Sequence, residues 1–233
     1  AVLSAVDRDS IAADTTGLAV SSILGIVGGG FDHGAWEQYS DPTATDRHLA
    51  DLAATLGRDF AADPPYAVYV SSSGDMTRQM GIRVAVQLEE AGWDVDTDFE
   101  GDFFGTQFPQ GLTDIWAIRL FPGVGGLGSA LSLFAAFDPF AEDTFIDWSS
   151  VGDPAVEYSD LIGRAHTELD PGVLQELLTR AEEILADNAV IYPLALRQPS
   201  YKLYWPERVQ GIVVHPVQGW DTSTAATWWS PSG

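Results

Sequence analysis

Short runs of β-branched and aromatic residues alternate along this chain with segments of helical periodicity. The strand-like runs cover residues 66–71, 93–99, 114–121, 190–196 and 209–214. Strands that are separated by helices are the pattern of α/β folds. The order therefore predicts an α/β protein, with helices on both faces of a mixed sheet. No linker or repeat divides the chain, so we expect one domain.

Three helix starts share the dipeptide Asp-Pro, at Asp41, Asp153 and Asp170. In such a start the Asp side chain accepts hydrogen bonds from free backbone N–H groups, and Pro supplies a helical φ at the first position. Further helices are predicted over residues 1–13, 43–56 and 75–91. After Asp170 the apolar residues recur at helical spacing, which predicts one buried face, and four charged residues are expected on the opposite side: Glu176, Arg180, Glu182 and Glu183.

Composition excludes several classes of protein. The 34 acidic and 11 basic residues give a net charge of −23, which repels nucleic acid and anionic membrane surfaces. The chain has no Cys, so disulfides, thiolate metal sites and cysteine nucleophiles are excluded. The uncharged stretch 15–31 is too short and too rich in glycine to cross a bilayer.

A G-x-G-x-x-G motif is formed by Gly123, Gly125 and Gly128, after a predicted strand and before an apolar helix. Such glycines allow a pyrophosphate to approach a helix N-terminus, which makes a dinucleotide-binding oxidoreductase one alternative. However, Pro122 separates the strand from the motif, and Arg119 interrupts the apolar strand. These departures favour a loop.

Signatures of metal binding and catalysis are weak. The acidic run that begins at Asp94 resembles a calcium loop, but Gln107 stands where a bidentate carboxylate is needed. Its alternating spacing suits a strand with a solvated acidic face. The four His are scattered, and no nucleophile elbow occurs. We predict no enzyme activity, no cofactor and no metal.

Four stretches of the sequence follow a family pattern. Residues 1–11 read AVLSAVDRDSI, residues 85–95 read AVQLEEAGWDV, and Gly111 precedes Asp114 by three positions. The longest series runs from Asp153 to Gly211 and includes these residues: Leu161, Ala165, Glu168, Asp170, Leu177, Ala181, Glu182, Ile184, Leu185, Asp187, Ala189, Ile191, Pro193, Leu194 and Val209. In these features the chain resembles the C-terminal lobe of family 5 extracellular solute-binding proteins, the dipeptide- and oligopeptide-binding receptors of ABC importers. It is most similar to their divergent actinobacterial lipoprotein branch.

The resemblance implies a periplasmic-binding-protein-like lobe over residues 1–233, with the N-terminal lobe absent. It implies binding of peptide or a related solute in a cleft between lobes, with an ABC permease as partner. It further implies a monomer without nucleic-acid partners, extracellular and anchored as a lipoprotein in its full-length form. An alternative within the same branch is an envelope lipoprotein that acts as a scaffold or regulator of cell-wall glycolipid synthesis.

Candidate ligand-binding residues follow the predicted strands or stand among the loop aromatics. Open α/β sheets bind ligands at the carboxyl ends of their strands. In peptide-binding relatives an Asp after the strand equivalent to 114–121 receives the peptide amine. This chain has Arg119 there, which suits a carboxylate or phosphate, with aromatic residues to cover the ligand. The predicted set is Arg119, Phe121, Trp116, Phe103 and Trp36. Core packing of the aromatics and a surface ion pair of Arg119 are the alternative.

Overall fold

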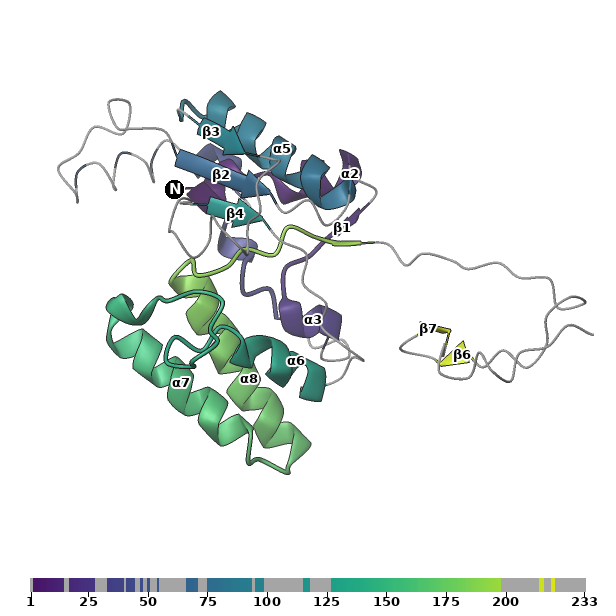
Figure 1. The fold of residues 1–233 in the computed structure, drawn as a ribbon, viewed down its shortest axis with the longest axis vertical. Helices are drawn as coiled ribbons and strands as arrows, with labels where there is room; N and C mark the ends of the chain where they lie inside the picture. Colours follow the sequence, from purple (N-terminus) through teal and green to yellow (C-terminus); the bar gives the residue numbers. More distant parts are fainter. Residues whose placement is uncertain are drawn as a thin grey trace, which may run out of the picture.

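A parallel sheet of three strands forms one layer of the molecule (Figure 1). The computed structural model describes residues 2–14, 17–27, 33–39, 41–44, 47, 50, 54, 66–70, 75–93, 95–98, 115–117, 127–197, 214–215 and 219–220. Strand β2 (Tyr66–Val70) lies between β3 (Val95–Asp98) and β4 (Ile115–Ala117) and is parallel to both. The α/β prediction is therefore confirmed, and the strands predicted at 66–71 and 114–121 share one sheet.

Helix α5 (Asp75–Glu90) connects β2 to β3 in sequence and packs against the sheet. It confirms the helix predicted at 75–91. Its buried residues Met80, Val84 and Leu88 form a hydrophobic cluster with residues from the N-terminal helices and with Trp93. The helix is followed by Gly92, which has a φ of 90°. The Trp93 N–H donates to the Leu88 carbonyl over 3.0 Å, the bond of a Schellman C-cap.

The first predicted helix, at 1–13, is in fact two helices. They are α1 (Val2–Ala5) and α2 (Arg8–Asp14). Asp7 separates them because its carboxylate accepts from the Ser10 N–H over 3.0 Å, which is the bond of an N-cap. The Asp7 N–H itself donates to Gln87 of α5 over 2.9 Å, so the break also docks this segment on α5.

The glycine-containing stretch 15–31 holds two elements that the sequence analysis did not predict. Strand β1 (Gly17–Ala19) pairs antiparallel with β5 (Ala195–Arg197). The strand predicted at 190–196 is wrong over residues 190–194, which form no strand, and only its last two residues lie in β5. A short helix, α3 (Ile23–Val27), follows. The chain therefore passes here from the layer of the sheet to a layer of helices (Figure 1).

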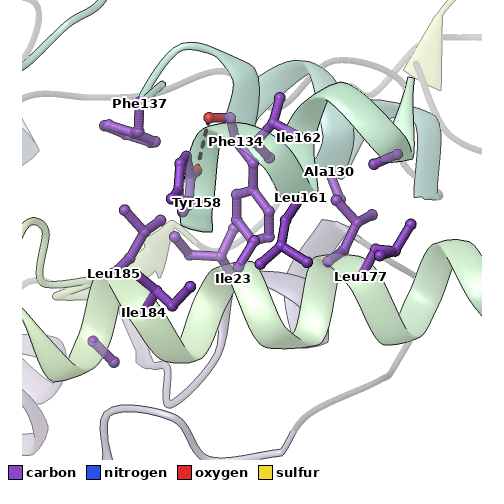
Figure 2. Packing of buried hydrophobic residues seen from close by; sticks show 14 of the residues in the cluster. Ile23, Ala130, Phe134, Phe137, Tyr158, Leu161, Ile162, Leu177, Ile184 and Leu185 are labelled. Atoms are coloured by element: carbon purple, nitrogen blue, oxygen red, sulfur yellow. Dashed lines mark hydrogen bonds between the residues drawn. The ribbon is translucent and has the colours of Figure 1, made fainter. Parts of the chain in front are cut away.

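The helical layer is built from α6 (Leu127–Ala135), α7 (Asp153–Ala165) and α8 (Pro171–Asp187), which pack on one another and bury the larger hydrophobic cluster. Phe134 and Tyr158 lie at its centre, and the Tyr158 hydroxyl donates to the Phe134 carbonyl over 2.8 Å (Figure 2). This bond satisfies a buried hydroxyl, so the aromatic ring can pack in the core without a polar penalty.

The prediction of one mixed sheet with helices on both faces is not confirmed. Within the described ranges, the three-stranded sheet is entirely parallel, and the antiparallel pairs belong to separate two-stranded sheets. One of these pairs is β1 with β5, and the other is β6 (Val214–His215) with β7 (Gly219–Trp220). Strand β6 is the described end of the strand predicted at 209–214.

The three Asp-Pro sequences differ in whether the Asp side chain caps a helix. Asp170 caps α8 as predicted, since its Oδ1 accepts from Gly172 N–H over 2.8 Å and from Val173 N–H over 3.3 Å. Asp153 does not cap α7, because Gly152 occupies the N-cap position and Asp153 is already helical. Asp41 caps only a 3₁₀ turn, η2 (Pro42–Ala44), and most of the helix predicted at 43–56 lies outside the described residues.

This difference in capping is testable by substitution. We expect Asp170→Ala to lower the free energy of unfolding by about 1 kcal/mol, because it removes two capping bonds. The matched variant Asp153→Ala removes no capping bond and should change stability by less than about 0.5 kcal/mol. Urea unfolding of both variants measures the difference. Equal losses would show that the Asp-Pro starts act alike, against the geometry described here.

The end of α8 offers a second stability test. Ala189 has a φ of 52°, and the Val190 N–H donates to the Leu185 carbonyl over 3.0 Å, so Ala189 occupies the position of a Schellman cap where glycine is unstrained. We expect Ala189→Gly to raise the free energy of unfolding by roughly 0.5–1 kcal/mol. Gly92→Ala, at the same position after α5, should lower it by a similar amount. Thermal unfolding would contradict this if both variants shifted the midpoint in the same direction.

Candidate functional site

The carboxyl ends of the three parallel strands meet at one edge of the sheet. Val70 at the end of β2 pairs with Ala117 at the end of β4, and Tyr69 pairs with Asp98 at the end of β3. The three strands therefore finish at nearly the same level. This edge is where open parallel sheets bind ligands, because the segments that follow the strands converge there.

The predicted ligand-binding residues are placed only in part. Trp116 is the middle residue of β4 and pairs in register with Tyr69. Arg119 and Phe121 follow β4 by two and four residues in sequence, and Phe103 follows β3 by five, and these three lie outside the described residues. Their assignment to ligand binding stays a prediction.

Trp36 occupies the hydrophobic core. Its side chain is fully buried in the larger cluster, and its indole N–H donates to the Ile191 carbonyl over 3.0 Å. Its backbone N–H donates to the Ser21 carbonyl. Trp36 could therefore contact a ligand only if the segment that carries it moved, and its predicted binding role stays untested.

A buried carboxylate lies where the chain passes between the two layers. Glu182, in the middle of α8, is completely buried. Its Oε2 accepts from the Ser22 hydroxyl over 2.9 Å, and its Oε1 accepts from the backbone N–H groups of Ile23 and Leu24. Burial raises the pKa of Glu182, and these hydrogen bonds together with nearby His33 oppose that rise. The carboxylate thus fixes the start of α3 against α8.

A buried guanidinium also contacts the segment where the chain passes between the two layers. Arg8 of α2 is 7% exposed, and it donates to the Val20 carbonyl over 2.5 Å and to the Trp36 carbonyl over 3.3 Å. Its Cζ lies 4.9 Å from the centre of the Tyr192 ring. Tyr192 packs against both hydrophobic clusters, and burial raises its pKa to about 12. Arg8 therefore links the sheet layer to the helical layer.

Neither buried charge was expected from the sequence. The prediction that Glu182 lies on the exposed side of its helix is wrong. Glu182 lies four residues after Leu178 and three before Leu185, both of which are fully buried, so helical spacing already put it on the core face. The signal was present, but the charged residue type was taken as evidence of exposure.

The other motifs form no candidate site within the described residues. The acidic run is partly in β3, which includes Asp96 and Asp98, as the alternating spacing predicted. Gly128 is the second residue of α6, whereas Gly123 and Gly125 lie outside the described residues. No group of three or more potential metal ligands occurs within the described part of the chain. None of its helices is long and apolar enough to cross a membrane.

The sequence matches no family model and no curated protein. The fold does match solved structures. CtaP, an ABC transporter substrate-binding protein of Listeria monocytogenes, is 18% identical with a TM-score of 0.64, and the match covers 98% of this chain and 46% of CtaP. NikA of Brucella suis, solved with Fe(III)-EDTA, is 16% identical with a TM-score of 0.62, over 84% of this chain and 40% of NikA.

A third similar structure is the peptide-binding protein of a peptide ABC transporter. It is 15% identical with a TM-score of 0.59, and the match covers 83% of this chain and 87% of that one. The chain thus spans less than half the length of CtaP and NikA. Likeness at this identity concerns the fold alone. The chain has the same fold as part of CtaP and part of NikA.

Proposed function

We propose that this chain is the C-terminal lobe of the substrate-binding component of an ABC importer. The observation that carries the proposal is the fold likeness to three substrate-binding proteins, with coverage of most of this chain but less than half of CtaP and NikA. The series of residues from Asp153 to Gly211 supports it from the sequence. In the full-length form we expect a monomer on the outer side of the membrane, held by a lipid anchor and paired with an ABC permease.

Peptide is the solute class we propose first, since the sequence resembles peptide-binding receptors. The binding edge is the carboxyl end of β3, β2 and β4, and it is completed by an N-terminal lobe that closes over the ligand. Arg119 follows β4 at this edge in sequence. A guanidinium suits a carboxylate, so we propose that it takes an anionic group of the ligand.

Calorimetric titration of the two-lobed protein with a pool of tri- to pentapeptides tests the proposal. We expect saturable binding, and we expect Arg119→Ala to weaken it by about tenfold or more, which is typical for loss of a hydrogen bond to a charged group. Arg83→Ala, on the exposed side of α5, is the matched control. Binding that depends on a free peptide amine and ignores Arg119 would contradict the anionic anchor.

Two other outcomes would replace the proposal. An envelope scaffold would bind no peptide and would instead retain an enzyme of glycolipid synthesis in a pulldown. An oxidoreductase would show saturable quenching of tryptophan fluorescence by NADH, and Gly125→Ala would abolish that quenching.

A further inference from the structure

Exposed apolar side chains gather where the chain enters α7. Phe140, in the turn after α6, is 56% exposed, Val151 is 42% exposed, and Val156, near the start of α7, is 59% exposed. Gly152 is the N-cap of α7, so Val151 and Val156 occupy the N′ and N4 positions, whose apolar side chains meet in a hydrophobic staple. The two valines are therefore neighbours, and both stay open to solvent.

Phe140 belongs to the same surface through Asp138. The Oδ1 atom of this carboxylate accepts from the Phe140 N–H over 3.0 Å, and its Oδ2 atom accepts from the Ser159 hydroxyl over 3.1 Å. Ser159 lies three residues after Val156, which makes the two residues neighbours on the helix surface. We call the exposed residues of 138–160 the α7 face. Contiguous exposed apolar groups mark interaction surfaces, whereas single ones are ordinary.

The α7 face is also strongly acidic. No Lys, Arg or His occurs in the sequence between Arg119 and Arg164. Two carboxylates of the face pair with arginines of α7 and α8. Four more are exposed and pair with no cation in the part of the chain that the structure describes: Glu142, Asp143, Asp147 and Asp153. The face thus combines apolar groups with negative charge that these ion pairs do not neutralise.

This combination limits what can cover the face. A second copy of the same face would bring like charges together, and the net charge of −23 disfavours nucleic acid and anionic membranes. A metal ion would neutralise carboxylates but would leave Phe140 in water, and no group of three potential metal ligands occurs among the residues described. A polypeptide that carries both cationic and apolar side chains matches both properties of the face.

We propose that the α7 face is a docking surface for a basic amphipathic segment of a partner protein. Apolar side chains of the segment cover Phe140 and Val156, and its Lys or Arg side chains meet the surrounding carboxylates. The ring of Phe140 also offers its face to a cation. This inference is independent of the solute that the protein binds.

Calorimetric titration of the full-length protein with a synthetic amphipathic helix tests the proposal. The probe consists of Lys and Leu, with the Leu side chains on one face. We expect saturable binding that weakens about tenfold between about 50 and 300 mM salt, because salt screens exposed charge pairs. A peptide with Glu in place of Lys, and another with Gln in place of Leu, should each bind at least about tenfold more weakly.

Substitution of the apolar residues locates the bound peptide. We expect the double variant Phe140→Ser, Val156→Ser to bind the Lys-Leu helix about tenfold more weakly than the wild type. Leu169→Ser is the matched control, because Leu169 is 94% exposed but lies outside the α7 face, in the turn between α7 and α8. It should change the affinity by less than about twofold.

Substitution of two adjacent carboxylates tests the charge of the face. We expect Glu142→Gln with Asp143→Asn to weaken binding about fivefold and to reduce its salt dependence. The matched control is Glu89→Gln with Glu90→Gln, two adjacent exposed carboxylates at the end of α5, which should change the affinity by less than about twofold. Circular dichroism confirms that the exposed substitutions leave the fold intact.

Three results would overturn the proposal. The first is a wild type that does not bind the Lys-Leu helix. The second is an equal loss of affinity in the face variants and their controls, which would show that the peptide follows overall charge. The third is a wild-type dimer in sedimentation experiments that Phe140→Ser dissociates, which would make a second copy the occupant of the α7 face.

Discussion

Replacement of Trp36 by Ala is expected to lower the free energy of unfolding by about 4 kcal/mol, the typical cost of removing a large aromatic side chain from a core. Trp36 is fully buried, and its indole N–H is bonded to the Ile191 carbonyl. The variant would leave both a cavity and an unsatisfied carbonyl. Trp36→Phe keeps most of the ring volume and should lose only about 1–2 kcal/mol. Urea unfolding monitored by circular dichroism measures both.

This result also decides the predicted role of Trp36 in ligand binding. Val156→Ala serves as control, because Val156 is 59% exposed on α7 and should cost less than about 0.5 kcal/mol. If Trp36→Ala were as stable as this control but bound peptide more weakly, then Trp36 would be a ligand contact and its burial in the core would not matter. A large loss of stability would instead identify it as a core residue.

Substitution of Arg8 by Met is expected to cost about 3 kcal/mol of stability. It leaves the carbonyls of Val20 and Trp36 without their donors in a buried site, and each such loss costs roughly 1–3 kcal/mol. Met preserves the apolar stem and most of the side-chain length, so the change isolates the guanidinium. Thermal and urea unfolding should agree on the loss.

Arg83→Met is the matched control for Arg8. Arg83 also makes an ion pair, with Asp14 over 3.1 Å, but the side chain of Arg83 is 51% exposed. Exposed pairs contribute less than about 1 kcal/mol, because water screens them and the side chains lose freedom. If both Arg variants lost the same free energy of unfolding, then burial of Arg8 would not increase its contribution to stability.

The sequence predicted the sheet because strands and helices obey local rules. Segment 66–70 is rich in β-branched and aromatic residues and forms β2, and segment 75–90 has helical spacing and forms α5. Gly92 follows the end of α5 because glycine adopts the positive φ of that position without strain. The split of the first helix at Asp7 was not predicted, although Asp7 caps α2 through a local bond from the Ser10 N–H. The docking of this break on α5 could not be predicted in this way, because Gln87 is 80 positions away in sequence.

The burial of the two charged residues at the site could not be predicted from the sequence pattern. Arg8 and Glu182 look like surface residues in sequence, since charged side chains are almost never fully buried unless partners are present. Most of their partners are backbone groups of a segment, 20–24, that reads as a loop, and the Ser22 hydroxyl and the Trp36 carbonyl complete the set. Only the tertiary arrangement brings those groups together. The proposed ligand-binding edge, in contrast, follows from strand direction alone, so the order of the elements is sufficient to propose it.

The most direct test of the central claim is amide hydrogen exchange of the two-lobed protein with and without the peptide pool, read by mass spectrometry. Binding at the carboxyl edge of β3, β2 and β4 predicts that the segments after these strands, residues 71–74, 99–103 and 118–122, become protected while α7 and α8 do not change. Protection confined to α7 and α8 would contradict the assignment of this edge as the solute-binding site, and no binding of any peptide would contradict peptide as its solute.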